Sequence, residues 1–96
     1  MNINTAKQFE LDFSNCSTLG EIYDIVKNEL ELPEWFGGNM SAFWDALTGI
    51  IEVPAVIIFY KQVRNKDLSP FVEKLIEIAH RAEHEEHLEL VVIEKE

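Results

Sequence analysis

The sequence contains few cysteines, few basic residues and no long apolar stretch. Cys16 is the only cysteine among the 96 residues, so no disulfide can form within the chain, as is typical of proteins from a reducing compartment. No segment approaches the roughly 20 apolar residues that a transmembrane helix requires. Residues 1–7 also lack the apolar run of a signal peptide. We therefore expect a cytoplasmic protein that does not bind membranes.

Basic residues are scarce enough to exclude some classes of partner. Eight Lys and Arg stand against eighteen Asp and Glu, which gives a formal net charge of −10. Nucleic acids and anionic membrane surfaces both bind basic proteins, so the composition argues against either ligand. A strongly acidic domain can instead attract a basic protein and accelerate its association. Solubility alone is the alternative explanation for such a charge.

The order of predicted elements indicates a single α/β domain. Apolar runs predict three strands, over residues 9–13, 53–60 and 88–92. Apolar residues at helical spacing predict three helices, over residues 19–30, 40–51 and 70–84, and a turn or short irregular helix over 61–67. The middle strand is apolar throughout, which is typical of a strand buried on both faces. Strands that alternate with helices pair in parallel through right-handed crossovers.

Short-range signals mark where the helices begin. Thr18 and Glu21 have the spacing of a capping box, and Asn39 is a favourable N-cap for the second helix. Ser69 followed by Pro70 predicts the N-cap and the first position of the third helix.

The loop before the second helix combines two aromatics with two glycines. Trp35 and Phe36 follow one another in a short loop, where both side chains cannot easily point inward. We expect one of them to face solvent, as interface anchors do, although packing of both on the core is the alternative. Gly37 and Gly38 allow a positive φ and a close approach of the backbone to a partner.

Asp45 is the candidate for the central contact on the second helix. It follows Trp44, and its neighbours one turn away, Ala42 and Gly49, are small. The carboxylate should therefore stand clear of its own helix, where it could enter a cationic pocket and mimic a phosphate. An ordinary solvated helix acid is the alternative.

Metal binding and catalysis find little support. His80 and His84 lie four residues apart on one helix face, which can bind zinc when an acid completes the set. The run from His84 to His87 is too short for the H-E-x-x-H motif, and the helix dipole also favours cations at this end. The sequence has no nucleophile elbow and no phosphate-binding glycine loop. We expect no enzymatic activity, no cofactor and no metal, with a small metal-binding protein as an alternative.

The segment from residue 30 to residue 54 resembles the barstar-like inhibitors of ribonucleases. The residues that carry the resemblance are Leu32, Pro33, Trp35, Phe36, Gly37, Asn39, Ala42, Phe43, Trp44, Asp45, Leu47, Thr48, Gly49 and Pro54. The resemblance implies one barstar-like domain over residues 1–96, with a three-stranded parallel sheet packed with three to four helices. It also implies that the loop and the second helix block the active site of a small ribonuclease.

Roles for single residues follow from the same resemblance. Asp45 would mimic a phosphate of RNA, and Trp35 would stack on the enzyme. The expected partner-binding residues are Trp35, Phe36, Gly37, Asn39, Ser41, Trp44, Asp45, Thr48 and Gly49.

The sequence departs from the family pattern in three places. Ser41 stands where the family prototype has a second contact acid, and Ile50 stands where it has an aromatic. A further contact acid in the last helix has no clear counterpart, because Glu77 is the nearest acid but Ile78 occupies the aligned position. These departures imply a different target enzyme or a lower affinity.

We therefore expect a monomeric inhibitor that blocks a basic ribonuclease, or a ribonuclease-like toxin, in a 1:1 complex. Inhibition would be steric, with no covalent step. The alternative is an acidic interaction module that binds another basic protein and inhibits nothing.

Overall fold

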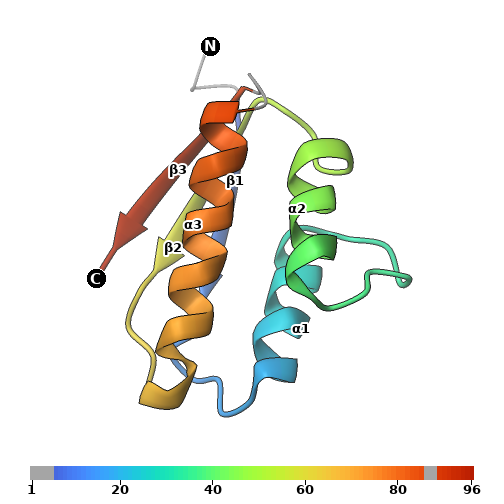
Figure 1. The fold of residues 1–96 in the computed structure, drawn as a ribbon. Coiled ribbons are helices and arrows are strands. Elements are labelled where there is room, and N and C mark those ends of the chain that lie inside the picture. Colours follow the sequence, from blue (N-terminus) through green and yellow to red (C-terminus); the bar gives the residue numbers. More distant parts are fainter. Residues whose placement is uncertain (1–5, 86–88) are drawn as a thin grey trace.

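Three parallel strands in the order β1–β2–β3 form the sheet, and the helices cover one of its faces. The computed structural model describes residues 6–85 and 89–96. Along the chain (Figure 1) the elements are β1 (Lys7–Asp12), α1 (Leu19–Glu29), α2 (Met40–Gly49), β2 (Ala55–Tyr60), the short 3₁₀ helix η2 (Lys66–Leu68), α3 (Ser69–Glu85) and β3 (Leu90–Lys95). The predicted α/β fold with a three-stranded parallel sheet is confirmed.

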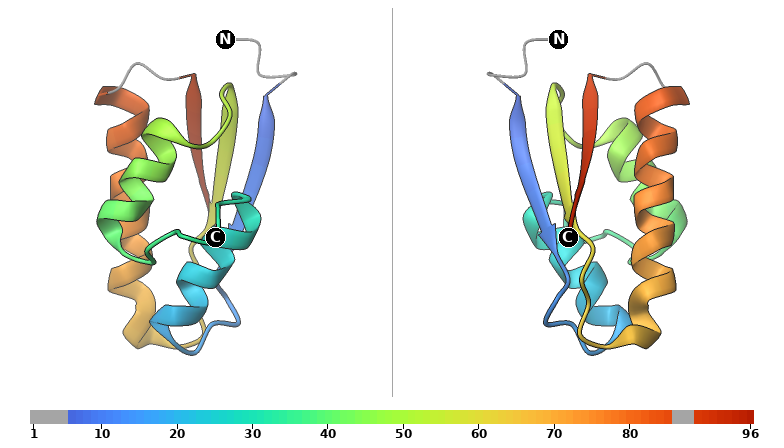
Figure 2. Two further views of the ribbon diagram at one scale, coloured as in Figure 1. Left: turned by 90° about the vertical axis from the view of Figure 1, so that its right-hand side faces the viewer. Right: turned by 90° about the vertical axis from the view of Figure 1, so that its left-hand side faces the viewer.

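The strand order explains why the helices share a face. Each crossover steps in the same direction, from β1 to β2 and from β2 to β3. Right-handed crossovers that step in one direction place their helices on the same side of the sheet. Figure 2, which turns the sheet to either side, shows the helices grouped there. The open face of β1 accordingly carries exposed Gln8, Glu10 and Asp12.

β2 is the central strand and the most buried part of the sheet. Its first five residues, 55–59, are all buried, as its unbroken apolar sequence predicts. The largest side chains of the core come from every layer and are Leu11, Phe13, Ile22, Phe43, Leu47, Ile57, Phe59 and Leu75. One contiguous cluster therefore joins the sheet to all three helices.

Two of the predicted helix starts are confirmed. Thr18 and Glu21 form the capping box, because the Glu21 N–H donates to Thr18 Oγ1 at 3.2 Å and the Thr18 N–H donates to Glu21 Oε1 at 3.1 Å. Asn39 caps α2, with its Oδ1 accepting the Ala42 N–H at 2.8 Å. These local signals worked because the cap and the groups that it binds lie within one turn.

The prediction that Ser69 is an N-cap is wrong. Ser69 has helical angles (φ −51°, ψ −46°) and follows η2 without a break. Asn65 supplies the cap instead, by accepting the Asp67 N–H at 3.1 Å. The chain thus enters α3 through the short irregular helix that residues 61–67 predict. This turn provides its own hydrogen bonds before α3 begins.

Other boundaries differ by two residues from the prediction. The second helix ends at Gly49, although the apolar stripe continues to Ile51, which packs partly against the core outside the helix. β2 begins at Ala55 and β3 at Leu90, while Leu88, where the last strand was predicted to begin, lies outside the described residues. Across residues 6–85 and 89–96, no helix has both the length and the apolar character needed to cross a membrane.

We predict that Leu75→Ala lowers the free energy of unfolding by about 2–5 kcal/mol, because the Leu75 side chain is fully buried and its removal leaves a cavity in the core. Glu73→Ala on the same helix is the control, since Glu73 is exposed and such changes usually stay within about 0.5 kcal/mol. Urea denaturation of both variants checks this. Equal stability of the two variants would contradict the assignment of Leu75 to the core.

Candidate functional site

The two aromatics of the loop before α2 point in different directions. Trp35 is 73% exposed, whereas Phe36 packs partly against the core. The Phe36 ring lies 6.3 Å from the ring of Tyr23 in a tilted arrangement. The prediction that one aromatic faces solvent is confirmed, and Phe36 is the residue that fastens the loop to α1.

The backbone freedom of this loop lies at Gly38 rather than at Gly37. Gly38 has a φ of +62°, in the left-handed region that side chains disfavour. Gly37 does not have a positive φ, so only one of the two glycines uses the freedom that both allow. Gly37 is nevertheless exposed next to Trp35 and Phe36, and its missing side chain leaves the loop backbone open to a partner.

Several of the expected contact residues also have a structural role in α2. Asn39 is exposed and caps the helix. The Thr48 hydroxyl is half-buried and donates a hydrogen bond to the Trp44 carbonyl at 2.9 Å. Ser41 and Gly49 are both exposed. The nine expected residues thus lie along one loop and one helix, but only some of them present side chains to solvent.

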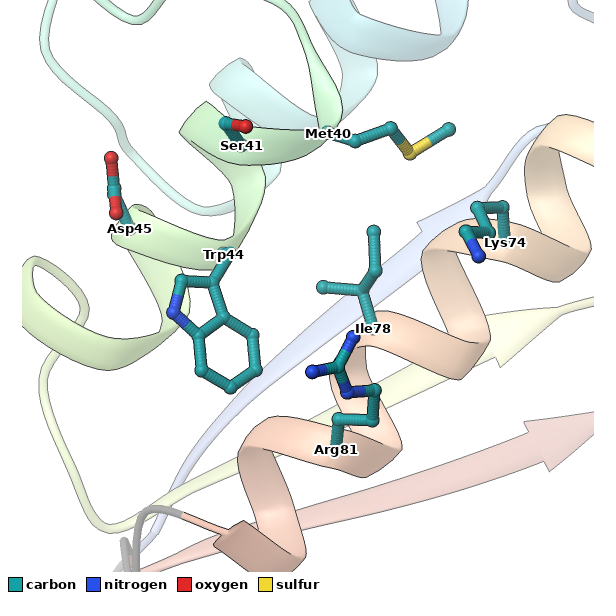
Figure 3. A pocket seen from close by; sticks show the side chains of 7 residues that line it. All are labelled: Met40, Ser41, Trp44, Asp45, Lys74, Ile78 and Arg81. Atoms are coloured by element: carbon teal, nitrogen blue, oxygen red, sulfur yellow. The ribbon is translucent and has the colours of Figure 1, made fainter.

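Asp45 is exposed on α2 and stands apart from other charges. Within the described part of the chain its carboxylate makes no hydrogen bond and no ion pair. Figure 3 shows this carboxylate directed away from α3, whereas the neighbouring Trp44 ring extends toward α3. The small neighbours Ala42 and Gly49 leave the carboxylate clear of its own helix, as expected.

A groove of about 370 Å³ runs between α2 and α3 beside Asp45 (Figure 3). Its lining comes from Met40, Ser41, Trp44 and Asp45 on α2 and from Lys74, Ile78 and Arg81 on α3. Ile78 is buried, which makes the middle of the groove apolar. The Arg81 guanidinium lies 5.6 Å from the centroid of the Trp44 ring, within the range of a cation–π contact.

Lys74 and Arg81 are the charged members of this site that sequence reasoning missed. Lys74 lies four residues before Ile78 and Arg81 three residues after it, so a helical plot places all three on one face of α3. This spacing indicates a shared site only once α2 is known to pack on this face of α3. Glu77, considered as a contact acid, does not line the groove. Among the described residues of α3, the groove is lined by two cations and no acid.

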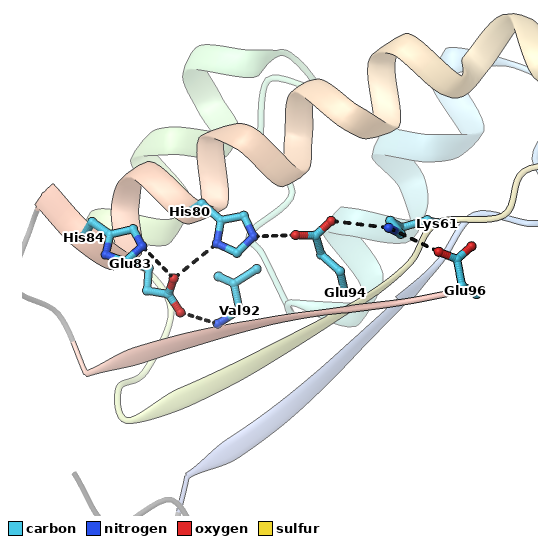
Figure 4. A network of polar contacts seen from close by, with 7 residues as sticks. All are labelled: Lys61, His80, Glu83, His84, Val92, Glu94 and Glu96. Atoms are coloured by element: carbon cyan, nitrogen blue, oxygen red, sulfur yellow. Dashed lines mark hydrogen bonds and ion pairs between the residues drawn. The ribbon is translucent and has the colours of Figure 1, made fainter.

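A second polar cluster lies on another side of α3, where the helix meets β3 (Figure 4). His80 contacts two carboxylates, with Nδ1 3.2 Å from Glu83 Oε1 and Nε2 2.9 Å from Glu94 Oε2. The other oxygen of Glu83 accepts the backbone N–H of Val92 at 2.7 Å. Because Glu94 and Val92 belong to β3, this cluster connects the C-terminal half of α3 to the edge strand.

Three side chains of this cluster are placed so that they could hold a metal ion. The ligand atoms of His80, Glu83 and His84 all lie within 4.8 Å of one another. Glu83 is already bound to His80 and to the β3 backbone, so the arrangement is complete as a helix-to-strand contact without an ion. His87, the other histidine of this region, lies outside the described residues.

The contacts of His80 shift two pKa values in opposite directions. Partial burial by itself would lower the pKa of His80, but the hydrogen bonds to Glu94 and Glu83 outweigh it and raise this pKa above its ordinary value. The same His80 hydrogen bond holds the pKa of Glu94 below its ordinary value, with help from Lys61. Both shifts act in favour of the charged pair, a protonated His80 beside an ionised Glu94.

The remaining candidate for covalent chemistry is the thiol of Cys16. Its side chain is buried, and burial raises the pKa of the thiol. Nearby acids, first among them Glu21, act in the same direction. A buried thiol that resists ionisation is a poor nucleophile, so Cys16 serves as a core residue.

We predict that His80→Gln lowers stability mainly at mildly acidic pH. A raised pKa in the folded state stabilises the protein fully below the ordinary histidine pKa of about 6.5, and this contribution disappears as the pH rises through the raised value. At the acidic limit, the contribution of Glu94 disappears as the pH falls through its lowered pKa. The loss should reach no more than about 1 kcal/mol, because the pair is partly exposed.

Urea denaturation of the wild type and of His80→Gln at pH 5.5 and pH 8.5 checks this prediction. The difference between the two proteins should be larger at the lower pH. A difference that does not change with pH would mean that His80 acts through packing alone.

Comparisons with known proteins identify the family of this chain. Residues 6–94 match the family described as Barstar (barnase inhibitor). The putative ribonuclease inhibitor YrdF of Bacillus subtilis (strain 168) is 29% identical over 75 residues, which cover 77% of this chain and 79% of that protein. The resemblance indicated by residues 30–54 is thereby confirmed. Because the family match extends over nearly the whole sequence, the chain belongs to the Barstar family of ribonuclease inhibitors.

Proposed function

We propose that this protein inhibits a basic ribonuclease, or a ribonuclease toxin, by covering its active site with the loop around Trp35 and with α2. The observation that carries the proposal is the position of Asp45. Its carboxylate is exposed beside a groove and has no partner among the described residues. A charge held in this way is available to another molecule without breaking an internal contact.

The chemistry of RNA cleavage explains why a carboxylate fits this role. A ribonuclease must bind the phosphates of its substrate, so its cleft presents cationic groups. Arginine binds carboxylate and phosphate with the same paired geometry. Asp45 can therefore occupy the position of a phosphate, while the protein backbone around it offers no bond that the enzyme could cleave as RNA.

The other expected contact residues support Asp45 in different ways. Trp35 is the exposed aromatic and is suited to stack on the rim of the enzyme cleft. Ser41, Gly37 and Gly49 are exposed around it and form the edge of the contact. The remaining residues hold this surface in place, either by packing (Phe36 and Trp44) or by hydrogen bonds (Asn39 and Thr48).

The proposal extends to the stoichiometry and the setting of the complex. One monomer would bind one enzyme molecule, since Asp45 and the loop form a single surface. A buried, unpaired thiol at Cys16 is compatible with a reducing compartment, so we place the protein in the cytoplasm. There it would act as an immunity protein or antitoxin, against a ribonuclease made by the same cell or delivered by another.

A panel of small secreted ribonucleases tests the proposal. The protein should abolish RNA cleavage by at least one of them at equimolar concentration, and the inhibited enzyme should co-elute with it at a 1:1 ratio. Binding that leaves cleavage intact would favour the acidic interaction module instead. No binding to any basic ribonuclease, including one encoded next to this gene, would overturn the proposal.

We predict that Asp45→Ala weakens binding to the inhibited enzyme by at least about 30-fold, since losing one partner of a buried charge pair costs about 2–5 kcal/mol. Asp24→Ala removes the same charge from an exposed site on α1 and should change the dissociation constant by less than about threefold. Titration calorimetry measures both. If the two variants bind equally well, Asp45 is not the central contact.

We also predict that association slows steeply as salt is added. The net charge of −10 attracts a basic enzyme over long distances, and this attraction is screened beyond about 8 Å at physiological ionic strength. Stopped-flow measurements at 25 mM and 500 mM NaCl should show the association rate falling by at least tenfold, with a smaller change in dissociation rate. A salt-independent association rate would exclude electrostatic steering.

A further inference from the structure

Two cations form part of a surface that is otherwise expected to bind cations. Lys74 and Arg81 line the α3 wall of the groove, and Asp45 lies on its α2 wall. The chain has only eight basic residues, so a quarter of them lie in this groove. A uniformly acidic surface would be the simplest device for binding a basic cleft. The charges of this groove therefore need their own explanation.

The cations are held apart from Asp45. Trp44 and Ile78 lie between Asp45 and the two cations (Figure 3), and no ion pair joins Asp45 to Lys74 or Arg81 among the described contacts. Arg81 instead rests against the Trp44 ring, 5.6 Å from its centroid. The groove thus keeps both signs of charge available rather than neutralising one with the other.

The internal partners of these cations are weak. Lys74 lies 3.5 Å from Glu77 and Arg81 lies 3.6 Å from Glu85, and all four side chains are more than half exposed. Exposed pairs of this kind along one helix contribute little to stability. A partner can therefore take over Lys74 and Arg81 at small cost. Arg81 is also pre-oriented, because the Trp44 ring limits the positions of its guanidinium.

We propose that the groove selects an enzyme whose surface carries both signs of charge. A cationic group meets Asp45, and a carboxylate of the same enzyme lies against Arg81 and Lys74, on the other side of Trp44. This inference rests on the proposed function, since the occupant is the inhibited ribonuclease. An enzyme with only cations at this surface would face Arg81 and Lys74 with like charges, which disfavours wrong partners.

The chemistry favours a protein carboxylate over a nucleic acid phosphate. Arg81 presents a planar fork that matches a carboxylate or a phosphate, but Asp45 and the net charge of −10 repel a polyanion. A single acidic side chain on an otherwise basic protein avoids that repulsion. The apolar middle of the groove, formed by Met40 and Ile78, can pack against the aliphatic part of such a side chain.

Charge reversal in the groove tests this inference, with barnase as the first probe. Barnase is named in the family description, and its RNA-binding cleft must present cations. Arg81→Glu should bind barnase at least tenfold more tightly than the wild type, because it replaces a repelling charge with an attracting one. Lys95→Glu is the control, since Lys95 is exposed at the end of β3 and the change in net charge is the same. Its effect should stay below threefold.

The second probe is the ribonuclease, other than barnase, that the wild type inhibits most strongly in the panel described above. Here Arg81→Glu should weaken binding at least tenfold, and Lys95→Glu should not. Lys74→Glu should act in the same direction as Arg81→Glu on each probe, and it leaves the contact between Arg81 and Trp44 intact. Lys74→Glu therefore replaces Arg81→Glu in these measurements if Arg81→Glu proves unstable in thermal unfolding.

The outcomes separate this inference from the proposed function. If the groove variants bind the inhibited ribonuclease as tightly as Lys95→Glu does, the inference is overturned, even though the protein inhibits that ribonuclease. If the wild type inhibits no ribonuclease, the proposed function fails. The affinities of the variants for barnase still show how the charge of the groove affects the binding of a basic protein. If Arg81→Glu binds both enzymes more tightly than the wild type does, the two cations select no carboxylate on the partner.

Discussion

The packing of α2 against α3 is the interaction on which the candidate binding surface depends. α2 has 10 residues, and isolated helices shorter than about 12–15 residues are marginal in water. Its stability must come from tertiary contacts, which Phe43, Ala46 and Leu47 supply by full burial. The Asn39 cap adds a smaller contribution at the first turn. Because the buried stripe sets the rotation of α2, it also sets where Trp44 and Asp45 point.

Different faces of the short helix α2 therefore serve packing and the proposed contact with a partner. One face anchors α2, the next presents Trp44 to α3, and the next exposes Asp45 to solvent. The loop before α2 repeats this division, with Phe36 packed on Tyr23 and Trp35 exposed. The buried side chains thus hold the candidate surface in place without a partner. Such preorganisation limits the entropy that binding costs.

Two electrostatic effects of different range act on this surface. The net charge of −10 is spread over the chain and attracts basic proteins in general. In the proposed complex, the arrangement in the groove would act only at contact, where Asp45 and Arg81 would face the partner on opposite sides of Trp44. In the proposed complex, the first effect would govern how often a basic enzyme is met, and the second would govern which enzyme stays bound.

The sequence predicted features that depend on neighbouring residues better than those that depend on packing. The capping box at Thr18, the Asn39 cap and the three strands follow from spacing within single elements, and the structure has them. The Ser69 cap failed because a preceding turn, capped by Asn65, takes its place. Spacing along one helix likewise does not reveal that α3 turns Lys74 and Arg81 toward α2, some thirty residues earlier in the chain.

The same limit applies to the contact between α3 and β3. His80 and Glu94 are separated by fourteen residues, and only the return of the chain along β3 brings them together. Sequence reasoning considered His80 and His84 together as metal ligands, because those two share a helix face. The structure adds Glu94 and the Val92 backbone N–H, which give the cluster a role in holding the edge strand.

The claim that Asp45 takes the place of an RNA phosphate is tested most directly by competition with a nucleotide. The dissociation constant between this protein and the inhibited ribonuclease is measured at increasing concentrations of a nucleoside 3′-monophosphate, which fills the enzyme's phosphate site. We predict that the dissociation constant rises in proportion to the nucleotide concentration, and that Asp45→Ala loses this dependence. A dissociation constant that stays unchanged at saturating nucleotide would contradict the account, because the protein would then bind outside the phosphate site.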